Sequence, residues 1–288
     1  MENKTMIKVR DLYHSYGNDK NAVDGVTFEV AEGGIFGFLG PNGAGKSTTQ
    51  KVLTGLLALQ KGEVVVAGQD IRRPTDELFN LIGVSFENPN VYRRMSGLEN
   101  LQFFASLYDV PTVDPMSLLR RVGLDPAAHR RAGAYSKGML QRLVFARSLL
   151  NRPKLWFIDE PTAGLDPTMT QLVKDIIREE RQGGATVFLT THNMQVAEEL
   201  CDRVAFLNEG RIAAMDTPRD LKLKYGAKLV TVESRRRGTV DREILSFSDP
   251  ADRKRLQELV GSGELETVHS QEASLEEVFI KVTGRGLQ

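Results

Sequence analysis

A glycine-rich stretch near the N-terminus has the residue types and spacing needed to hold a chain of phosphate groups. It follows the pattern G-x-x-x-x-G-K-[ST], in which glycines let main-chain N–H groups approach an anion without obstruction by side chains. Lys46 adds a mobile positive charge for the outer phosphates, and Ser47 adds a hydroxyl of the kind that suits Mg²⁺. The predicted phosphate-binding loop consists of Gly40, Pro41, Asn42, Gly43, Ala44, Gly45, Lys46, Ser47 and Thr48.

Two adjacent carboxylates, Asp159 and Glu160, follow an apolar run at residues 155–158. Successive residues that leave a strand point in different directions, so one carboxylate can face a metal ion and the other a water molecule. Phosphoryl transfer to water needs this division of work, and we assign Asp159 to Mg²⁺ and Glu160 to the attacking water. The alternative is a pair of surface acids, which the preceding apolar run disfavours.

These groups must be positioned by buried strands that alternate with helices. The candidate strands are the short apolar runs at residues 35–39, 81–86, 155–158 and 186–190. The alternation predicts an α/β fold with a mainly parallel sheet, which binds ligands at the carboxyl ends of its strands. Residues 6–13 and 23–30 alternate between apolar and polar side chains, and they predict paired edge strands around a loop at residues 17–20.

From about residue 88 to residue 152 the apolar residues recur at helical spacing. Ser96 and Glu99 have the spacing of a capping box, in which each side chain bonds the main-chain N–H of the other residue. A later helix is expected to begin near Ser136 and to continue to Leu150. We interpret this segment as a helical insert in the α/β domain.

Composition excludes several classes of protein. Lys plus Arg and Asp plus Glu both number 38 in the 288 residues, and the resulting net charge of zero argues against binding nucleic acid through bulk charge. The single cysteine, Cys201, excludes an intramolecular disulfide, and we interpret it as a packing residue at the end of a helix. No signal peptide and no run of about 18 apolar residues is found, so a membrane role is expected to require a partner.

The pattern of expected strands and helices changes around Leu221. Strands are expected near residues 228–233, 240–247 and 264–269, with helices near 250–260 and 274–283. These elements predict a small α+β lobe over residues 221–288. Its sequence Arg235-Arg236-Arg237-Gly238 could bind an acidic partner, but we favour a solvated hairpin tip.

Five motifs occur in a fixed order: the phosphate-binding loop, residues 135–139, residues 155–160, residues 163–166 and Thr190-Thr191-His192. Together they resemble the nucleotide-binding subunits of ATP-binding-cassette (ABC) transporters over about residues 6–220. The resemblance implies a P-loop NTPase core of the RecA-like type in a domain at residues 1–220. More weakly, residues 273–279 resemble the tail of the drug and antibiotic exporter ATPases of that family.

The resemblance implies that two such domains face head to tail and enclose two ATP molecules. It places the signature loop, which contacts the γ-phosphate bound by the other subunit, at Ser136, Lys137, Gly138 and Met139. Asp166 matches the loop that couples the two sites, and His192 matches a switch histidine that contacts the γ-phosphate. Tyr16 matches the aromatic residue that stacks on adenine, although an ordinary packed tyrosine is nearly as good an interpretation.

Two departures from the family pattern concern chemistry. Glu87 stands where the family has a glutamine; it can still ligate Mg²⁺ and belongs to the catalytic set, but it adds negative charge near the γ-phosphate. Slower turnover or tighter metal dependence is the expected consequence. In the signature, Lys137 and Met139 replace a glycine and a glutamine, while Ser136 and Gly138 remain, so we expect a working site.

These observations predict an ATPase subunit that powers an exporter. The implied partners are a separate transmembrane permease, which would hold the chain at the cytoplasmic face of the membrane, and a second ATP-binding subunit, identical or different. Residues 88–92 are a plausible docking rim for the permease. The alternatives are a soluble cassette ATPase that acts on DNA or ribosomes and a non-hydrolytic nucleotide-sensing module. The zero net charge argues against the first, and the intact Lys46, Asp159, Glu160 and His192 argue against the second.

Overall fold

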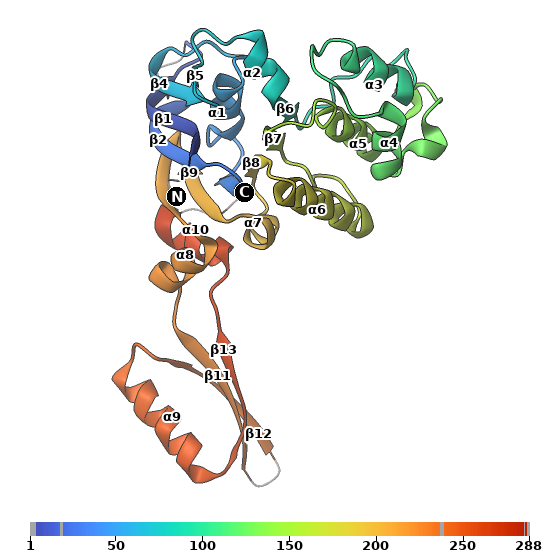
Figure 1. The fold of residues 1–288 in the computed structure, drawn as a ribbon. Helices are drawn as coiled ribbons and strands as arrows, with labels where there is room; N and C mark the ends of the chain where they lie inside the picture. The colour runs from blue at the N-terminus through green and yellow to red at the C-terminus, as the bar shows by residue number, and fades with distance from the viewer. Residues whose placement is uncertain (1–3, 18–19, 237–238, 285, 287–288) are drawn as a thin grey trace. The chain divides into compact units, whose positions relative to one another are not determined.

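The computed structural model describes residues 4–17, 20–236, 239–284 and 286 (Figure 1). It divides into two compact units, of which the first ends at Asp216 and the second covers Thr217–Gly286. Part of the predicted loop, Asn18-Asp19, and part of the predicted hairpin tip, Arg237-Gly238, lie outside the described residues.

A six-stranded sheet forms the centre of the first unit, in the order β10-β9-β3-β8-β7-β6. Its strands are β3 (Ile35–Leu39), β6 (Ile82–Ser85), β7 (Leu155–Asp159), β8 (Thr186–Thr191), β9 (Arg203–Asn208) and β10 (Arg211–Asp216). All neighbours run parallel except β10, which pairs with β9 in the antiparallel sense. Every residue of β3, β7 and β8 is buried, as expected for strands that are covered on both faces. The predicted mainly parallel sheet is confirmed.

A second sheet, in the order β2-β1-β4-β5, is antiparallel. It contains β1 (Thr5–His14), β2 (Val23–Ala31), β4 (Lys61–Val66) and β5 (Gln69–Asp70). The expectation that the first two strands are both edge strands is wrong for β1, which lies between β2 and β4. Alternation of apolar and polar residues shows that one face of a strand is covered. The same alternation occurs in edge strands and in central strands, so it does not distinguish them.

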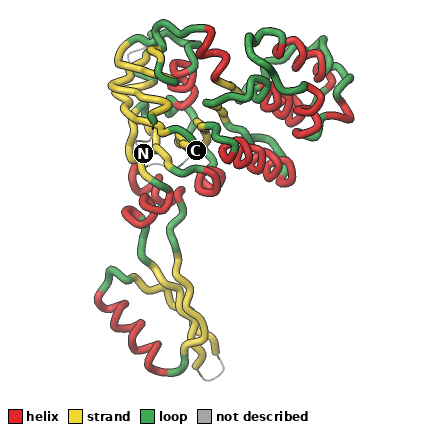
Figure 2. The backbone as a smooth tube through the Cα atoms, in the orientation of Figure 1, coloured by secondary structure: helices red, strands yellow, loops and turns green. Residues whose placement is uncertain are grey.

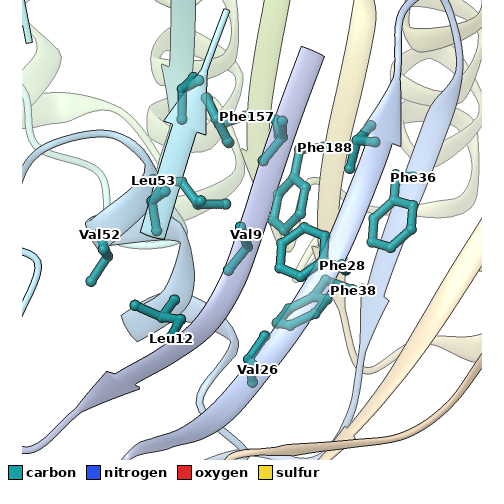
Figure 3. Close-up of a cluster of buried hydrophobic side chains, with 14 of the residues drawn as sticks. Val9, Leu12, Val26, Phe28, Phe36, Phe38, Val52, Leu53, Phe157 and Phe188 are labelled. Carbon is teal, nitrogen blue, oxygen red and sulfur yellow. The ribbon is translucent and has the colours of Figure 1, made fainter. Parts of the chain in front are cut away.

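The two sheets of this unit share an aromatic core (Figure 3). Phe28 of β2 stacks on Phe36 of β3 with ring centroids 5.5 Å apart, and Phe188 of β8 lies 5.9 Å from each of them. Burial of one such side chain stabilises the fold by about 1.5–3 kcal/mol. Because Phe36 and Phe38 both belong to β3, the cluster anchors the strand that leads into the phosphate-binding loop.

Helices cover the remainder of the first unit. They are α1 (Lys46–Leu53), α2 (Asp76–Leu81), α3 (Gly97–Ala105), α4 (Pro115–Arg121), α5 (Lys137–Arg147), α6 (Pro167–Gln182) and α7 (Met194–Leu200), with short 3₁₀ turns at Asp125–Ala127 and Ala132–Ala134. The capping box at Ser96 and Glu99 is present at the start of α3. Helix α5 ends at Arg147, before the expected Leu150, because the N–H groups of Leu149 and Leu150 bond three residues back, as in a turn.

The second unit consists of a three-stranded antiparallel sheet, a helix packed on it, and two further helices (Figure 2). Its elements are α8 (Pro218–Tyr225), β11 (Leu229–Arg236), β12 (Thr239–Ser246), α9 (Pro250–Ser262), β13 (Leu265–Gln271) and α10 (Leu275–Thr283). Val230, Val232, Leu245 and Leu259 form the core between sheet and helix α9. Across the described residues, we find no helix with the length and apolar character required to cross a membrane.

Candidate active site

The phosphate-binding loop connects β3 to α1, and its glycines are required by close packing. A side chain at Gly40 would clash with the carbonyl oxygen of Leu207, and one at Gly45 would clash with that of Ala22. Gly43 has a φ of +79° and open space where a side chain would be, so the main chain is exposed there. The loop therefore presents bare backbone at the N-terminus of α1, where the helix dipole favours an anion.

Lys46 is the first residue of α1, and its side chain folds back over the loop. Its Nζ donates hydrogen bonds to the carbonyl oxygens of Gly40 at 2.7 Å and Pro41 at 3.1 Å. Burial lowers the pKa of Lys46, while the carboxylates of Glu160, Asp159 and Glu87 oppose that shift. A buried ammonium held by two neutral carbonyls and by Glu160 at 4.0 Å can be reoriented toward a phosphate.

Asp159, at the end of β7, faces the first turn of α1. The Ser47 hydroxyl donates to Asp159 Oδ2 at 3.1 Å, and the Thr190 hydroxyl of the adjacent strand donates to Oδ1. Burial raises the pKa of Asp159 against the effect of these two hydrogen bonds. A hydroxyl and a carboxylate in contact are hard oxygen donors that could hold a divalent cation, which would favour the ionised carboxylate.

Glu160 is the next residue, and it has a left-handed φ of +47°, which costs a non-glycine residue about 1–2 kcal/mol. The residue is 5% exposed. Its carboxylate accepts hydrogen bonds from the Thr191 hydroxyl at 2.9 Å and from the His192 main-chain N–H at 2.8 Å. His192 Nδ1 lies 2.7 Å from the same carboxylate. The turn thus directs Glu160 away from Asp159 and toward the end of β8.

These groups converge on one cavity of about 270 Å³. It is lined by Tyr16, Ala22, Asn42, Gly43, Gly45, Lys46, Ser47, Thr48, Glu87, Asp159 and Glu160. Tyr16 is 57% exposed and its hydroxyl lies 3.2 Å from the hydroxyl of Thr48, so it is not an ordinary packed tyrosine. Of the predicted loop, Gly40, Pro41 and Ala44 are not among the lining residues.

The signature residues and Asp166 do not line this cavity. Ser136 caps α5, accepting a hydrogen bond from Met139 N at 3.3 Å, and Asp166 caps α6, accepting from Thr168 N at 3.0 Å. A Cβ atom at Gly138 would lie 3.4 Å from the Leu165 side chain, so the two caps belong to adjoining segments. The chain therefore carries two separate sets of predicted site residues.

Comparison with known proteins identifies this arrangement. Residues 23–163 match the ABC transporter family. The chain is 49% identical over 284 residues to a fluoroquinolones export ATP-binding protein of Mycobacterium tuberculosis, covering 98% of this chain and 94% of the relative. The chain belongs to the ATP-binding subunits of ABC transporters.

Other similar proteins belong to the same family. A daunorubicin resistance ATP-binding protein of Streptomyces coeruleorubidus is 34% identical over 97% of this chain and 96% of its own. A solved ATP-binding subunit of an ABC transporter has a TM-score of 0.70 and 30% identity over 77% of this chain and 94% of its own. These similarities confirm the predicted P-loop α/β fold, the ATPase activity and the exporter type, in preference to a soluble cassette ATPase or a non-hydrolytic module.

Three polar side chains of this ABC subunit position Asp159 and Glu160, and the sequence alone did not predict that role. Thr190 and Thr191 bond Asp159 and Glu160, and Gln141 of α5 bonds the main chain of Glu160. The threonines follow from strand register, since Asp159 pairs with Thr190 across parallel strands. No local pattern marks Gln141, because its partner is 19 residues away in another element.

Proposed function

We propose that this chain hydrolyses MgATP at the cavity between β3, β7 and α1, and that a transmembrane permease uses the released energy for export. The observation that carries the proposal is the convergence of Lys46, the Ser47–Asp159 pair and Glu160 on that one cavity. A cation site and a proton acceptor beside a phosphate-binding loop are the parts that phosphoryl transfer to water requires.

Each residue then has a role. The loop N–H groups and Lys46 bind the β- and γ-phosphates, and Tyr16 stacks on the adenine. Ser47 and Asp159 would hold Mg²⁺, which would neutralise charge on the phosphates, and Glu87 adds a further oxygen donor at the same cavity. Glu160 orients the attacking water and accepts its proton, and His192 holds the Glu160 carboxylate from the end of β8.

We propose that a second ATP-binding subunit completes the site. Ser136, Lys137, Gly138 and Met139 form the N-terminal turn of the 11-residue helix α5, which would face the γ-phosphate bound by the partner. Lys137 adds positive charge there, and Asp166 lies in the adjoining segment. We propose that residues 1–220 form this ATP-binding domain and residues 221–288 an accessory domain; the compact units of the fold divide slightly earlier, after Asp216.

The permease is proposed to bind a largely apolar groove of about 390 Å³ whose lining includes Leu56, Phe79, Phe86, Phe104 and Leu107. Leu56, Phe79 and Leu107 are all exposed, which is unusual for large apolar side chains without a partner. Tyr92 lies beside this groove, with its ring centroid 5.9 Å from that of Phe104. An apolar segment of a membrane protein fits this surface and would hold the chain at the cytoplasmic face of the membrane.

We expect the permease to select the cargo, and the names of the relatives suggest a drug.

Phosphate release from MgATP by the purified chain tests the proposal. We expect a rate per subunit that rises with protein concentration, because two subunits build each site. Glu160→Gln should lower that rate by about 100-fold or more, since it removes the proton acceptor but keeps the side-chain shape. Glu63→Gln, an exposed carboxylate on β4, is the matched control and should leave the rate unchanged. A wild-type rate no higher than that of Glu160→Gln would refute hydrolysis at this cavity.

A further inference from the structure

Gln141 of α5 is a buried amide whose two ends differ in their contacts. Its Nε2 donates a hydrogen bond to the main-chain carbonyl oxygen of Glu160 at 3.0 Å. Its Oε1 is buried and has no hydrogen-bond partner among the described residues. A buried acceptor without a partner is unfavourable, so an apolar side chain of similar size would serve packing alone at least as well. The bond to Glu160 is therefore the feature that requires a chemical explanation.

The main chain of Glu160 is held by three hydrogen bonds in its left-handed conformation. Its N–H donates to Thr190 O at 2.9 Å, and its carbonyl oxygen accepts from Ala163 N at 3.2 Å and from Gln141. The first bond comes from the neighbouring strand and the second from the turn that follows. Gln141 supplies the only one of the three that comes from α5.

Helix α5 begins at the signature residues, which places Gln141 in its second turn. Ser136 is the N-cap, and Gly138 in the first turn lies next to Leu165 in the segment after Glu160, where an added Cβ would be 3.4 Å from the Leu165 side chain. The helix thus lies against the Glu160 segment near Gly138 and is bonded to it by Gln141. A displacement of the Ser136 end of α5 must be passed to the main chain of Glu160 or must break the Gln141 bond.

We infer that Gln141 is a positioning residue that couples the signature helix to the Glu160 carboxylate of the same chain. The inference rests on the proposed function. Ser136 contacts nucleotide held by the partner subunit, whereas Glu160 acts on nucleotide held by its own chain. Through Gln141, occupancy of the partner's nucleotide site sets the orientation of Glu160 and so the rate of hydrolysis in this chain's own site.

Asn151 provides a matched control. It is also a buried amide that donates to main-chain carbonyl oxygens, of Asn80 at 3.0 Å and Ile82 at 2.8 Å, and its Oδ1 likewise has no partner among the described residues. Its bonds secure the start of β6 and do not involve the cavity residues. A general effect of losing one buried amide should appear in Asn151→Leu as well as in a Gln141 variant.

The test measures kcat and KM for MgATP in the full chain, together with thermal unfolding. Gln141→Met keeps the length of the side chain, and Gln141→Leu is the second variant. We expect kcat to fall about tenfold with KM within about twofold of wild type, because the chemical step and not ATP binding depends on Glu160. Asn151→Leu should keep the wild-type kcat for its folded fraction.

A double-mutant cycle with Ser136→Ala tests the coupling itself. If Gln141 transmits the effect of Ser136, the double variant should be close to the slower single variant and not to the product of the two losses. Wild-type kcat in both Gln141 variants, additive losses in the cycle, or an equal loss in Asn151→Leu would each overturn the inference. Wild-type activity no higher than that of Glu160→Gln would instead refute the proposed function.

Discussion

At the scale of single residues, Glu87 adds a negative charge to a cavity that already contains two carboxylates. Among the lining residues, the carboxylates of Glu87, Asp159 and Glu160 face the single ammonium of Lys46. The charge of Glu87 contributes to the raised pKa of Asp159 and opposes the lowering of the pKa of Lys46. Such a cavity attracts a divalent cation but repels the triphosphate that accompanies it.

Glu87→Gln should therefore speed turnover and weaken the binding of Mg²⁺. Removing a negative charge near the γ-phosphate should raise kcat roughly threefold, and it should raise the Mg²⁺ concentration that gives half-maximal rate because the cavity attracts the cation less. Phosphate release measured over a Mg²⁺ titration checks both effects. Glu63→Gln on the surface of β4 is the control for loss of one charge. An unchanged rate together with an unchanged Mg²⁺ titration in Glu87→Gln would contradict this role.

The sequence was most informative where a residue's function depends on its immediate neighbours. The phosphate-binding loop was predictable because its glycines, Lys46 and Ser47 act through local backbone geometry. The hydroxyls of Thr190 and Thr191 and the amide of Gln141 act across 31 or 19 residues of chain. Their roles depend on strand register and helix packing, which only the folded chain provides.

At the scale of elements, α3 organises the expected docking rim. Asn100 is buried in this helix; its Oδ1 accepts from Tyr92 N at 2.9 Å, and its Nδ2 donates to Tyr92 O at 3.0 Å and Ser96 O at 2.8 Å. This set of bonds holds the segment before α3 to the helix. Tyr92 remains 48% exposed, and its ring lies beside those of Phe103 and Phe104.

Tyr92→Glu should uncouple transport from hydrolysis. A charge on this exposed ring position should weaken binding of an apolar permease segment by about tenfold or more, while the nucleotide cavity is untouched. Cargo export by cells and ATPase of the purified subunit check the two halves of this expectation. Val260→Glu on α9, at an apolar position that is also exposed, is the control. Wild-type export in Tyr92→Glu would exclude Tyr92 from the docking surface.

Element boundaries were predictable where a cap marks them. Helix α6 begins at Pro167, directly after its N-cap Asp166, and ends at Gln182, directly before Gly183-Gly184. The helices α2 and α8 were missed because each is short and has few buried residues to show a period. The central place of β1 was also missed, since it depends on β4, whose residues pair with β1 from 48 to 59 positions away in the sequence.

At the scale of the whole molecule, the two sets of site residues imply a shared site. Lys46, Asp159 and Glu160 meet at the cavity, whereas Ser136 and Asp166 cap helices outside its lining. A twofold arrangement satisfies both sets at once, because each chain then supplies its signature helix to the cavity of the other. Two different defects, one in each set, should therefore complement each other.

Mixing two inactive variants tests this arrangement. Lys46→Ala removes the phosphate charge, and Ser136→Asp keeps a good N-cap for α5 but opposes a phosphate. Each variant alone should be inactive at both sites of its dimer. In an equal mixture, half of the dimers pair the two variants, and each of these has one site with both Lys46 and Ser136, so up to about a quarter of wild-type phosphate release should return. Activity equal to the sum of the separate variants would mean that two copies of this chain do not share a site.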